Sequence, residues 1–256
     1  MKFIYKNTSI FYSLKGQGPV VVFIHGFLED STMWEPILAS CTGMQTLVID
    51  LPGHGRSKNF DDLYTMDQMA LVVIALLDIL EIKSATVVGH SMGGYIALAM
   101  AQNHPNYLEK LILVNSTPLP DSPERLKSRK QAIVLLGQIP ARFTAMAIKS
   151  LFDKDQIDSL LPTINKLQQN AAKLDPKGII AAVKGMMARP DRTAILEQLT
   201  LPKVFIASLK DPIIDASQMA AISTKAGAQF VLLPGGHMSS YEQPEKLKQV
   251  LLHFIK

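Results

Sequence analysis

Ser91, in the sequence GHSMGG, has the surroundings of a nucleophile. An apolar run at 85–88 precedes it and a helix-compatible run at 95–101 follows, so Ser91 falls on a sharp strand-to-helix turn. Glycines at 89 and 93 allow the chain to fold tightly around such a turn. The N-terminus of the following helix offers free N–H groups to a developing negative charge. This pattern predicts a serine that attacks a carbonyl carbon.

A serine hydroxyl needs a base that takes its proton, and His237 is the best placed of the six histidines. It follows the apolar run at 230–233, which puts it with Ser91 at the carboxyl edge of a parallel sheet. The other histidines lie in glycine-flanked turns or in helices and at their ends, where structural roles are expected. They are His25, His54, His90, His104 and His253.

A carboxylate that orients the base should also follow a strand at this edge. Asp211, in the sequence ASLKDP after the run at 204–207, meets this requirement in the chain order serine, acid, histidine. Asp215 is an alternative that could already belong to the next helix, and Asp121 is a third candidate. We expect Asp211 to be the acid.

Two backbone amides should stabilise a tetrahedral oxyanion. Met92 supplies the N–H that follows the nucleophile, and Phe27, in the sequence HGFL, supplies the N–H from the loop after the buried run at 20–24. Gly26 lets this loop approach closely. The Phe27 ring would also line the mouth of the pocket.

The elements that must position these residues form an α/β pattern. Runs near the N-terminus alternate as in an antiparallel edge pair, and the later runs are continuous and apolar, as in a buried parallel sheet. The expected strands are 3–5, 10–14, 20–24, 46–49, 85–88, 111–114, 204–207 and 230–233. Helical patterns between them, two with capping-box spacing at Thr32/Glu35 and Thr65/Gln68, predict helices on both faces of the sheet.

The alternation stops at Asn115, and residues 116–199 are expected to form consecutive helices separated by prolines. We therefore predict a core of residues 1–115 and 200–256 with a helical cap at 116–199. Apolar cap residues would form a pocket roof. The expected substrate contacts are Phe27, Phe143, Met146 and Met238, while Arg142 and Arg189 could hold a substrate carboxylate but are more simply surface residues.

Composition is that of one large soluble domain with an insertion: 256 residues, 48% of them hydrophobic, and a net charge of +4. The dense basic cluster at 125–130 is expected to be a solvated helix face, so no nucleic-acid partner is predicted. The single cysteine, Cys41, excludes an intrachain disulfide, and no metal site is predicted. With no signal-like segment and no long apolar run, we expect a cytoplasmic protein that does not bind membranes.

Four groups of motifs resemble the α/β-hydrolase fold superfamily, specifically its small capped serine hydrolases. They are HGF at 25–27, DLPGHGRS at 50–57, GHSMGG at 89–94, and GH at 236–237 with EQP at 242–244. The resemblance implies an eight-stranded sheet, a helical cap, a triad of Ser91, Asp211 and His237, and no cofactor. Members often carry glycine where this chain has Ser208, which keeps Asp215 open as the acid. Related dehalogenases and epoxide hydrolases use an aspartate nucleophile, so Ser91 disfavours their chemistry.

The expected function is cleavage of carboxylic esters of small, largely apolar molecules through an acyl-enzyme intermediate. A C–C hydrolase, a lyase of the menaquinone-pathway type and a perhydrolase would use the same triad and differ in pocket shape. A receptor that keeps the fold without turnover is the alternative from another class. The sequence does not specify the acyl group or whether the protein is a monomer or a homodimer.

Overall fold

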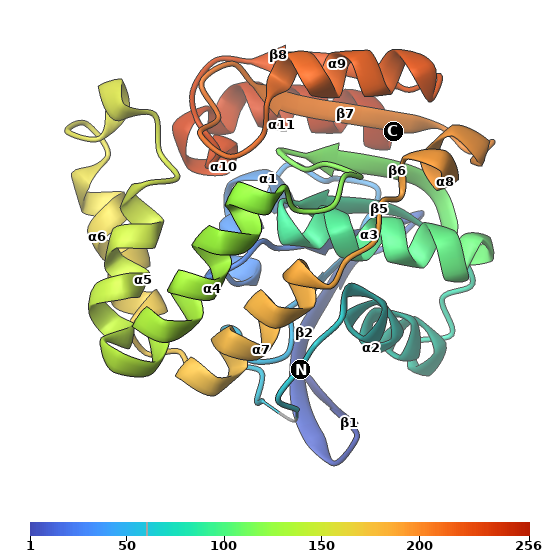
Figure 1. Cartoon of the computed structure of the whole chain (residues 1–256). Coiled ribbons are helices and arrows are strands. Elements are labelled where there is room, and N and C mark those ends of the chain that lie inside the picture. The colour runs from blue at the N-terminus through green and yellow to red at the C-terminus, as the bar shows by residue number, and fades with distance from the viewer. Residues whose placement is uncertain (60) are drawn as a thin grey trace.

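A mostly parallel sheet organises the chain, which the computed structural model describes over residues 1–59 and 61–256 (Figure 1). Eight strands in this part of the chain pair in the order β1-β2-β4-β3-β5-β6-β7-β8. Only β2 runs antiparallel to its neighbours β1 and β4 within these described strands. The strands are β1 (Lys2–Tyr5), β2 (Thr8–Gly16), β3 (Val20–Ile24), β4 (Gln45–Ile49), β5 (Ala85–His90), β6 (Leu108–Val114), β7 (Lys203–Ser208) and β8 (Gln229–Leu233).

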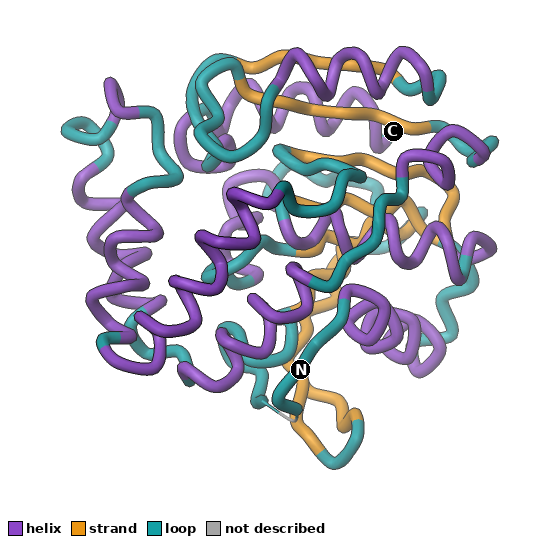
Figure 2. The backbone as a smooth tube through the Cα atoms, viewed as in Figure 1, coloured by secondary structure: helices purple, strands orange, loops and turns teal. Residues whose placement is uncertain are grey.

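Helices cover both faces of this sheet (Figure 2). Side chains of the strands alternate between two hydrophobic clusters. One cluster contains Val22 and side chains of α2 (Met66–Ile79), α3 (Met92–Asn103) and α9 (Ala216–Lys225). The other contains Val21 with side chains of α1 (Glu35–Leu38) and α11 (Pro244–Ile255). The shorter elements nearby are α10 (Ser239–Glu242) and the 3-10 helices η1 (Ser31–Trp34) and η2 (Pro105–Tyr107).

The predicted fold class is confirmed: this is an α/β-hydrolase fold with eight strands and helices on both faces. All eight expected strands are present, with ends that differ by at most three residues. The capping box at Thr65 and Gln68 is confirmed, with each side chain bonded to the other's backbone N–H. The box expected at Thr32 and Glu35 is wrong, because the Asp30 carboxylate caps η1 by accepting the Thr32 N–H.

Five helices lie between β6 and β7 in the chain, and α4 to α7 form a separate group beside the sheet in Figure 1. Four of the prolines expected to separate the helices lie at helix boundaries, in the first or second position of α4, α5, α6 and α7, where a missing N–H costs nothing. The helices are α4 (Pro123–Gln138), α5 (Pro140–Lys149), α6 (Leu161–Ala171), α7 (Pro176–Met187) and α8 (Thr193–Gln198), with the 3-10 helix η3 (Lys154–Gln156) between α5 and α6.

Helix α7 lies very close to loops that follow β4. A Cβ atom on Gly178 would be 2.8 Å from the Gly53 Cα, and one on Gly185 would overlap the backbone carbonyl of Tyr64. The Tyr64 N–H also donates to the Ala181 carbonyl at 3.2 Å. Glycine therefore allows α7 to contact the core directly.

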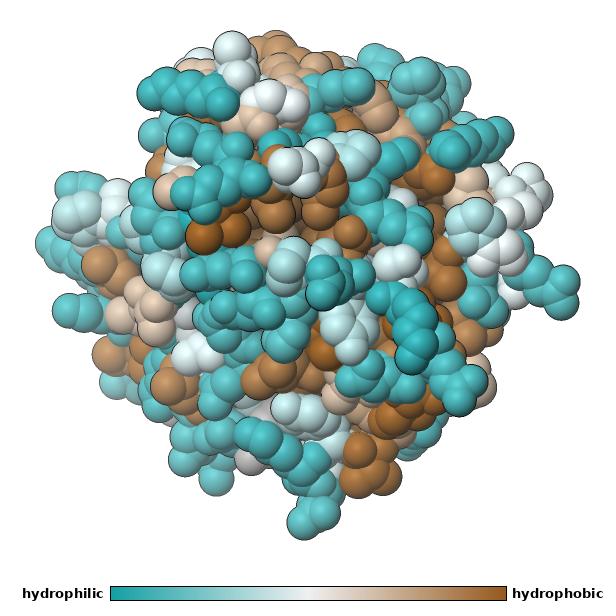
Figure 3. Space-filling view, turned by 90° about the vertical axis from the view of Figure 1, so that its right-hand side faces the viewer, coloured by the Kyte–Doolittle hydropathy of each residue, from teal (hydrophilic) through white to brown (hydrophobic). Residues whose placement is uncertain are grey.

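The surface carries both hydrophilic and hydrophobic side chains. On the face shown in Figure 3, hydrophilic side chains cover much of the surface and hydrophobic ones lie between them. None of the described helices is both long and apolar enough to cross a bilayer.

Candidate active site

The turn between β5 and α3 holds Ser91 in an unusual backbone conformation. β5 ends at His90, α3 begins at Met92, and Ser91 has φ +50° and ψ −114°. A side chain at Gly89 would collide with the carbonyl of Gly93, so the turn requires glycine there. Holding a non-glycine residue in such a region costs roughly 1–3 kcal/mol. The surrounding structure offsets this cost and holds Ser91, which is half-buried, at the carboxyl edge of the sheet.

His237 connects Ser91 to Asp211. Its Nε2 lies 2.9 Å from the Ser91 Oγ, and its Nδ1 lies 2.8 and 3.0 Å from the two carboxylate oxygens of Asp211. Since the carboxylate only accepts, Nδ1 carries the proton and Nε2 is left to accept from the serine hydroxyl. The structure thus brings together the three residues that the sequence placed on separate loops.

The Asp211 carboxylate is ionised in its loop. Burial would raise its pKa, but the neighbouring His237 and hydrogen bonds from Asn115 and the Ile213 N–H lower it below the usual value. The alternative Asp215 caps α9 through the Ser217 and Gln218 N–H groups.

Asp121, the third candidate acid, is buried in ion pairs with Arg129 and Arg189. The Asp121 side chain has no contact with His237 among the described interactions.

Asn115 supports the acid and was not singled out for this role from the sequence. Its amide Nδ2 donates to Asp211 Oδ2 and to Ser208 Oγ, each at 2.9 Å, and its Oδ1 accepts from the Ser239 hydroxyl. Ser208 thus takes part in this network. The sequence did contain a signal for Asn115. It is a polar residue directly after β6, at the same edge of the sheet where Ser91 follows β5 and Asp211 follows β7.

The two expected oxyanion donors lie beside the nucleophile. Met92 is the first residue of α3, where backbone N–H groups have no partner within the helix. A Cβ on Gly26 would be only 3.2 Å from the Ser91 Cβ, so the loop that carries Phe27 passes directly over the serine. Both amides therefore come from segments that adjoin Ser91.

A buried ion pair between Glu29 and His90 holds these loops together. Glu29 Oε2 accepts from the Gly26 N–H at 2.6 Å and from His90 Nδ1 at 2.9 Å, and His90 Nε2 lies 2.9 Å from the His237 carbonyl oxygen. Because both partners of the ring are acceptors, both ring nitrogens must donate, so His90 is an imidazolium. Burial would lower the pKa of His90, but the Glu29 carboxylate raises it. His90 and Glu29 thus connect the loop of Gly26, the turn that carries Ser91 and the loop of His237.

Glu242 makes a second connection, between the loop of His237 and the segment that follows α5. Its carboxylate accepts from the N–H groups of Gly236, Met238 and Asp153, and the His237 N–H donates to the Leu151 carbonyl at 2.9 Å. Burial raises the pKa of Glu242, while the three N–H donors lower it. The segment after α5 is therefore bonded directly to the His237 backbone, and through the Glu242 carboxylate it is linked to the residues on both sides of His237.

A cavity of about 350 Å³ opens between helices α4, α5 and α7 and the loops that carry Phe27 and Ile213. Phe27, Phe143 and Met146 line it, as expected for substrate contacts. Met238 does not line it, because its side chain is fully buried (0% exposed) in the core at the start of α10. The lining residues are Phe27, Leu28, Arg125, Ser128, Arg129, Ala132, Phe143, Met146, Ala147, Ser150, Leu151, Val183 and Ile213.

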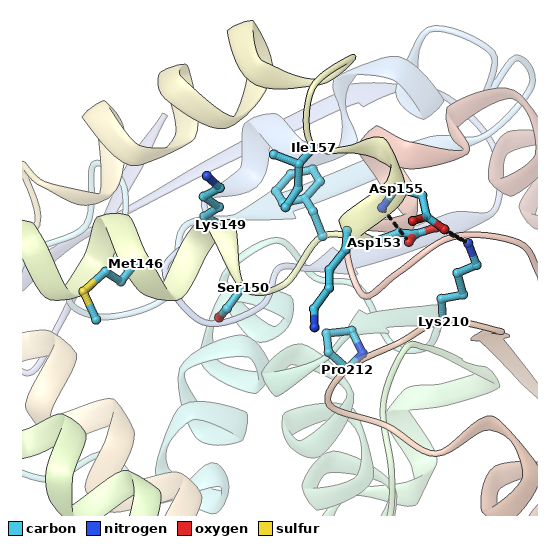
Figure 4. Close-up of a pocket in the computed structure, with 10 residues that line it drawn as sticks. Met146, Lys149, Ser150, Asp153, Asp155, Ile157, Lys210 and Pro212 are labelled. Carbon is cyan, nitrogen blue, oxygen red and sulfur yellow. Dashed lines mark hydrogen bonds and ion pairs between the residues drawn. The ribbon is translucent and has the colours of Figure 1, made fainter.

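A larger pocket, of about 580 Å³, is lined by the end of α5, the segment that follows it, and Lys210 and Pro212 (Figure 4). Lys210 reaches across it to Asp153 at 3.2 Å and to Asp155 at 2.5 Å, so the loop that carries Asp211 is ion-paired with the inserted segment. Ser91, Asp211 and His237 line neither of these two pockets. Phe27, the expected oxyanion donor, and Ile213, from the loop of Asp211, line the smaller cavity and not the larger one, so the smaller cavity is the better candidate for substrate.

Two of three arginines that were expected on the surface are buried. Arg142 is exposed, as expected. Arg189 is buried, because Asp121, two backbone carbonyls and the Tyr95 ring surround its guanidinium. Arg129, expected on a solvated face, is buried against Asp121. No cluster of His, Cys, Asp or Glu within residues 1–59 and 61–256 could hold a metal ion.

Comparisons with known proteins agree with this fold. A sequence model of a family described as alpha/beta hydrolase fold matches residues 19–156. A malate-bound thermophilic esterase from Thermogutta terrifontis is 30% identical in sequence, covers 96% of this chain and 93% of its own, and superposes with a TM-score of 0.91.

Two curated relatives match nearly the whole chain. 3-Oxoadipate enol-lactonase 2 of Acinetobacter baylyi is 26% identical over 264 residues, which is 98% of this chain and 94% of that protein. The dihydrolipoyllysine-residue acetyltransferase component of the acetoin cleaving system of Pseudomonas putida is 28% identical over 260 residues. This match covers 96% of the chain, which spans only 66% of that relative's length.

Proposed function

Since the chain belongs to the α/β-hydrolase fold family, we propose that it is a serine hydrolase that cleaves carboxylic esters of small, largely apolar substrates. One observation carries this proposal: the continuous hydrogen-bonded path from the Ser91 hydroxyl through His237 to Asp211. In this path each proton has a donor and an acceptor, as nucleophilic catalysis by serine requires.

In the first half of the reaction, Ser91 Oγ attacks the ester carbonyl as its proton passes to His237 Nε2. The Asp211 carboxylate stabilises the imidazolium that forms. The Phe27 and Met92 amides donate to the oxyanion of the tetrahedral intermediate. When the C–O bond breaks, His237 returns its proton to the leaving alcohol, and the acyl group remains on Ser91.

In the second half, His237 takes a proton from water, and the resulting hydroxide attacks the acyl carbonyl. The second tetrahedral intermediate collapses to a carboxylic acid, and Ser91 Oγ regains its proton. One ester and one water thus give one acid and one alcohol, with no cofactor consumed.

The comparisons support ester cleavage. One relative is named an esterase and another an enol-lactonase, and a lactone is a cyclic ester. The apolar lining of the cavity and its volume of about 350 Å³ favour a small substrate.

The test is the rate of p-nitrophenyl ester hydrolysis as a function of acyl chain length. Ser91→Ala should lower kcat by at least about 10⁴-fold, as loss of a triad nucleophile does. Ser159→Ala, which removes an exposed hydroxyl elsewhere, is the matched control and should retain full activity. Unchanged turnover in Ser91→Ala would overturn the proposal.

Labelling with a fluorophosphonate separates the alternatives. If Ser91 is labelled but esters are not turned over, the triad is active on another bond, and C–C hydrolase, lyase and perhydrolase substrates are to be tested. If Ser91 is neither labelled nor active while small ligands bind tightly, the protein is a receptor with a hydrolase fold.

A further inference from the structure

Arg125 lies at the boundary between the cavity described above and a neighbouring pocket. The Arg125 side chain lines both, and the neighbouring pocket is also lined by Tyr95, Asp121 and Arg189. Arg125 is half-buried, unlike Lys127 and Lys130 on the same helix, which are exposed. The expectation that this basic cluster is a solvated face thus fails for Arg125 as well as for Arg129.

The Arg125 guanidinium has no hydrogen-bond or ion-pair partner in the described part of the chain; only its backbone N–H is bonded, to Ser122. The two arginines nearest to it share a single carboxylate. Arg129 Nε lies 2.5 Å from one oxygen of Asp121, and Arg189 Nη1 lies 2.7 Å from the other. Asp121 thus pairs with two of the three arginines, and Arg125 is the one without a direct ion pair. The acidic residues near it, Asp121, Asp191 and Asp215, line the neighbouring pocket and not the cavity.

This arrangement leaves the Arg125 guanidinium without a direct ion pair on the side that faces the cavity. Burial lowers its pKa, and the charge of Arg129 lowers it further, while Asp121 and Tyr95 act in the opposite direction. A guanidinium still remains protonated at neutral pH. A partly buried charge without a partner is costly, and an anion that binds there removes that cost.

The lining of the cavity favours an anionic ligand. Two cationic side chains, Arg125 and Arg129, line it, and none of the described residues that line it is acidic. Most of the others are apolar. A guanidinium also matches the planar, two-oxygen geometry of a carboxylate.

We propose that the substrate is a small ester that carries a second, free carboxylate, and that Arg125 binds this carboxylate while Ser91 attacks the ester. The inference rests on the proposed function, because it names the class of ester that the same site cleaves. Arg129 adds to the positive field, but Asp121 already holds its guanidinium.

The experiment compares monoethyl esters of succinic, glutaric and adipic acid with ethyl hexanoate, which has the chain length of the adipate ester but no carboxylate. Wild type should prefer at least one monoester. Arg125→Gln should lower the ratio of kcat/KM for that monoester to kcat/KM for ethyl hexanoate by about 10- to 100-fold, as expected when a hydrogen bond to a charged group is lost. Arg125→Lys should recover part of this ratio, and Lys127→Gln should leave it unchanged.

Binding of the free diacids, measured by calorimetry, separates this inference from the proposed function. Adipate or a shorter diacid should bind wild type and lose at least about tenfold in affinity in Arg125→Gln. If no ester is hydrolysed but this difference in binding is found, ester cleavage is wrong and the carboxylate site stands. If neutral esters are hydrolysed and Arg125→Gln changes neither the ratio nor diacid binding, the carboxylate site is wrong.

Discussion

At the scale of single residues, neighbouring histidines differ because their hydrogen-bond partners differ. The ring centroids of His90 and His237 are 5.1 Å apart. His90 faces a carboxylate and a carbonyl, so it must carry two protons, whereas His237 faces a carboxylate and a hydroxyl and can carry one. His54, buried beside His25, has its pKa lowered to about 3, chiefly by burial, and is neutral. The site thus holds a fixed cation next to a base that is free to accept a proton.

Glu29→Gln tests the role of this fixed cation. Glutamine can place an oxygen where Glu29 Oε2 lies, but it removes the negative charge that keeps His90 protonated. A neutral His90 has one N–H and must release either residue 29 or the His237 carbonyl. We expect a loss of about 2–4 kcal/mol in the free energy of unfolding and a decrease of about tenfold or more in kcat. Urea unfolding and ester hydrolysis measure the two effects.

The pH dependence of this loss follows from the two pKa shifts. Burial opposes ionisation of Glu29, but His90 lowers the pKa of Glu29 below 4.5, so its contribution is present above pH 4.5 and disappears as pH falls through the folded-state pKa. The pKa of His90 is raised above 6.5, so its contribution is present below pH 6.5 and disappears as pH rises through the raised value. The stability difference should be largest between pH 4.5 and 6.5. Glu35→Gln, at an exposed position, should show no such window.

Several site residues could be predicted from the sequence and others could not. Ser91, Asp211 and His237 follow strands of one parallel sheet, so their common edge was predictable before their distances were known. Arg125 was not, because spacing alone does not show which side of α4 faces a cavity. Met238 was misplaced because the turn into α10 directs its side chain into the core.

At the scale of elements, predictability depended on whether the signal was local. The strands follow from continuous β-branched runs, and the cap at Thr65 follows from a four-residue motif. The start of η1 was missed because Asp30 competes for the N–H that a Thr32 box would have used. The path of α7 could not be predicted either, because it depends on contacts between glycines and loops more than 100 residues away in the chain, at Gly53 and Tyr64.

Two glycine substitutions test the close approach of α7. Gly185→Ala should destabilise the protein by about 1–3 kcal/mol, because the added methyl group would overlap the Tyr64 carbonyl and move α7. Gly137→Ala is the matched control in α4, where nothing lies within 4 Å of the added atom. There alanine should stabilise by up to about 1 kcal/mol through helix propensity. Equal effects of the two changes in urea unfolding would show that α7 has room to adjust.

At the scale of the whole molecule, the sheet joins two hydrophobic clusters on its opposite faces. Val87 and Val88 are adjacent in β5 and fully buried, yet Val87 belongs to the cluster with α2 and α3, and Val88 to the cluster with Trp34 and α11. Because the same backbone carries both, the two clusters should unfold together.

Val87→Ala and Val88→Ala test this cooperativity. Each should lower the free energy of unfolding by about 2–3 kcal/mol, as deletion of buried methyl groups does. The single tryptophan, Trp34, lies on the Val88 side, so its fluorescence reports that face. Val87→Ala should shift the fluorescence midpoint as much as the circular dichroism midpoint. Val134→Ala, at an exposed position on α4, should change the free energy of unfolding by no more than about 0.5 kcal/mol with either probe. Separate midpoints for Val87→Ala would contradict a single transition.

The cavity and the triad come from different stretches of the chain. Ser91, Asp211 and His237 follow β5, β7 and β8, whereas most residues that line the cavity belong to α4, α5 and α7. Substitutions between residues 123 and 187 can therefore change which molecules fit while the three loops keep their geometry. In evolutionary terms, we expect the range of molecules that fit to diverge faster than the geometry of the three loops.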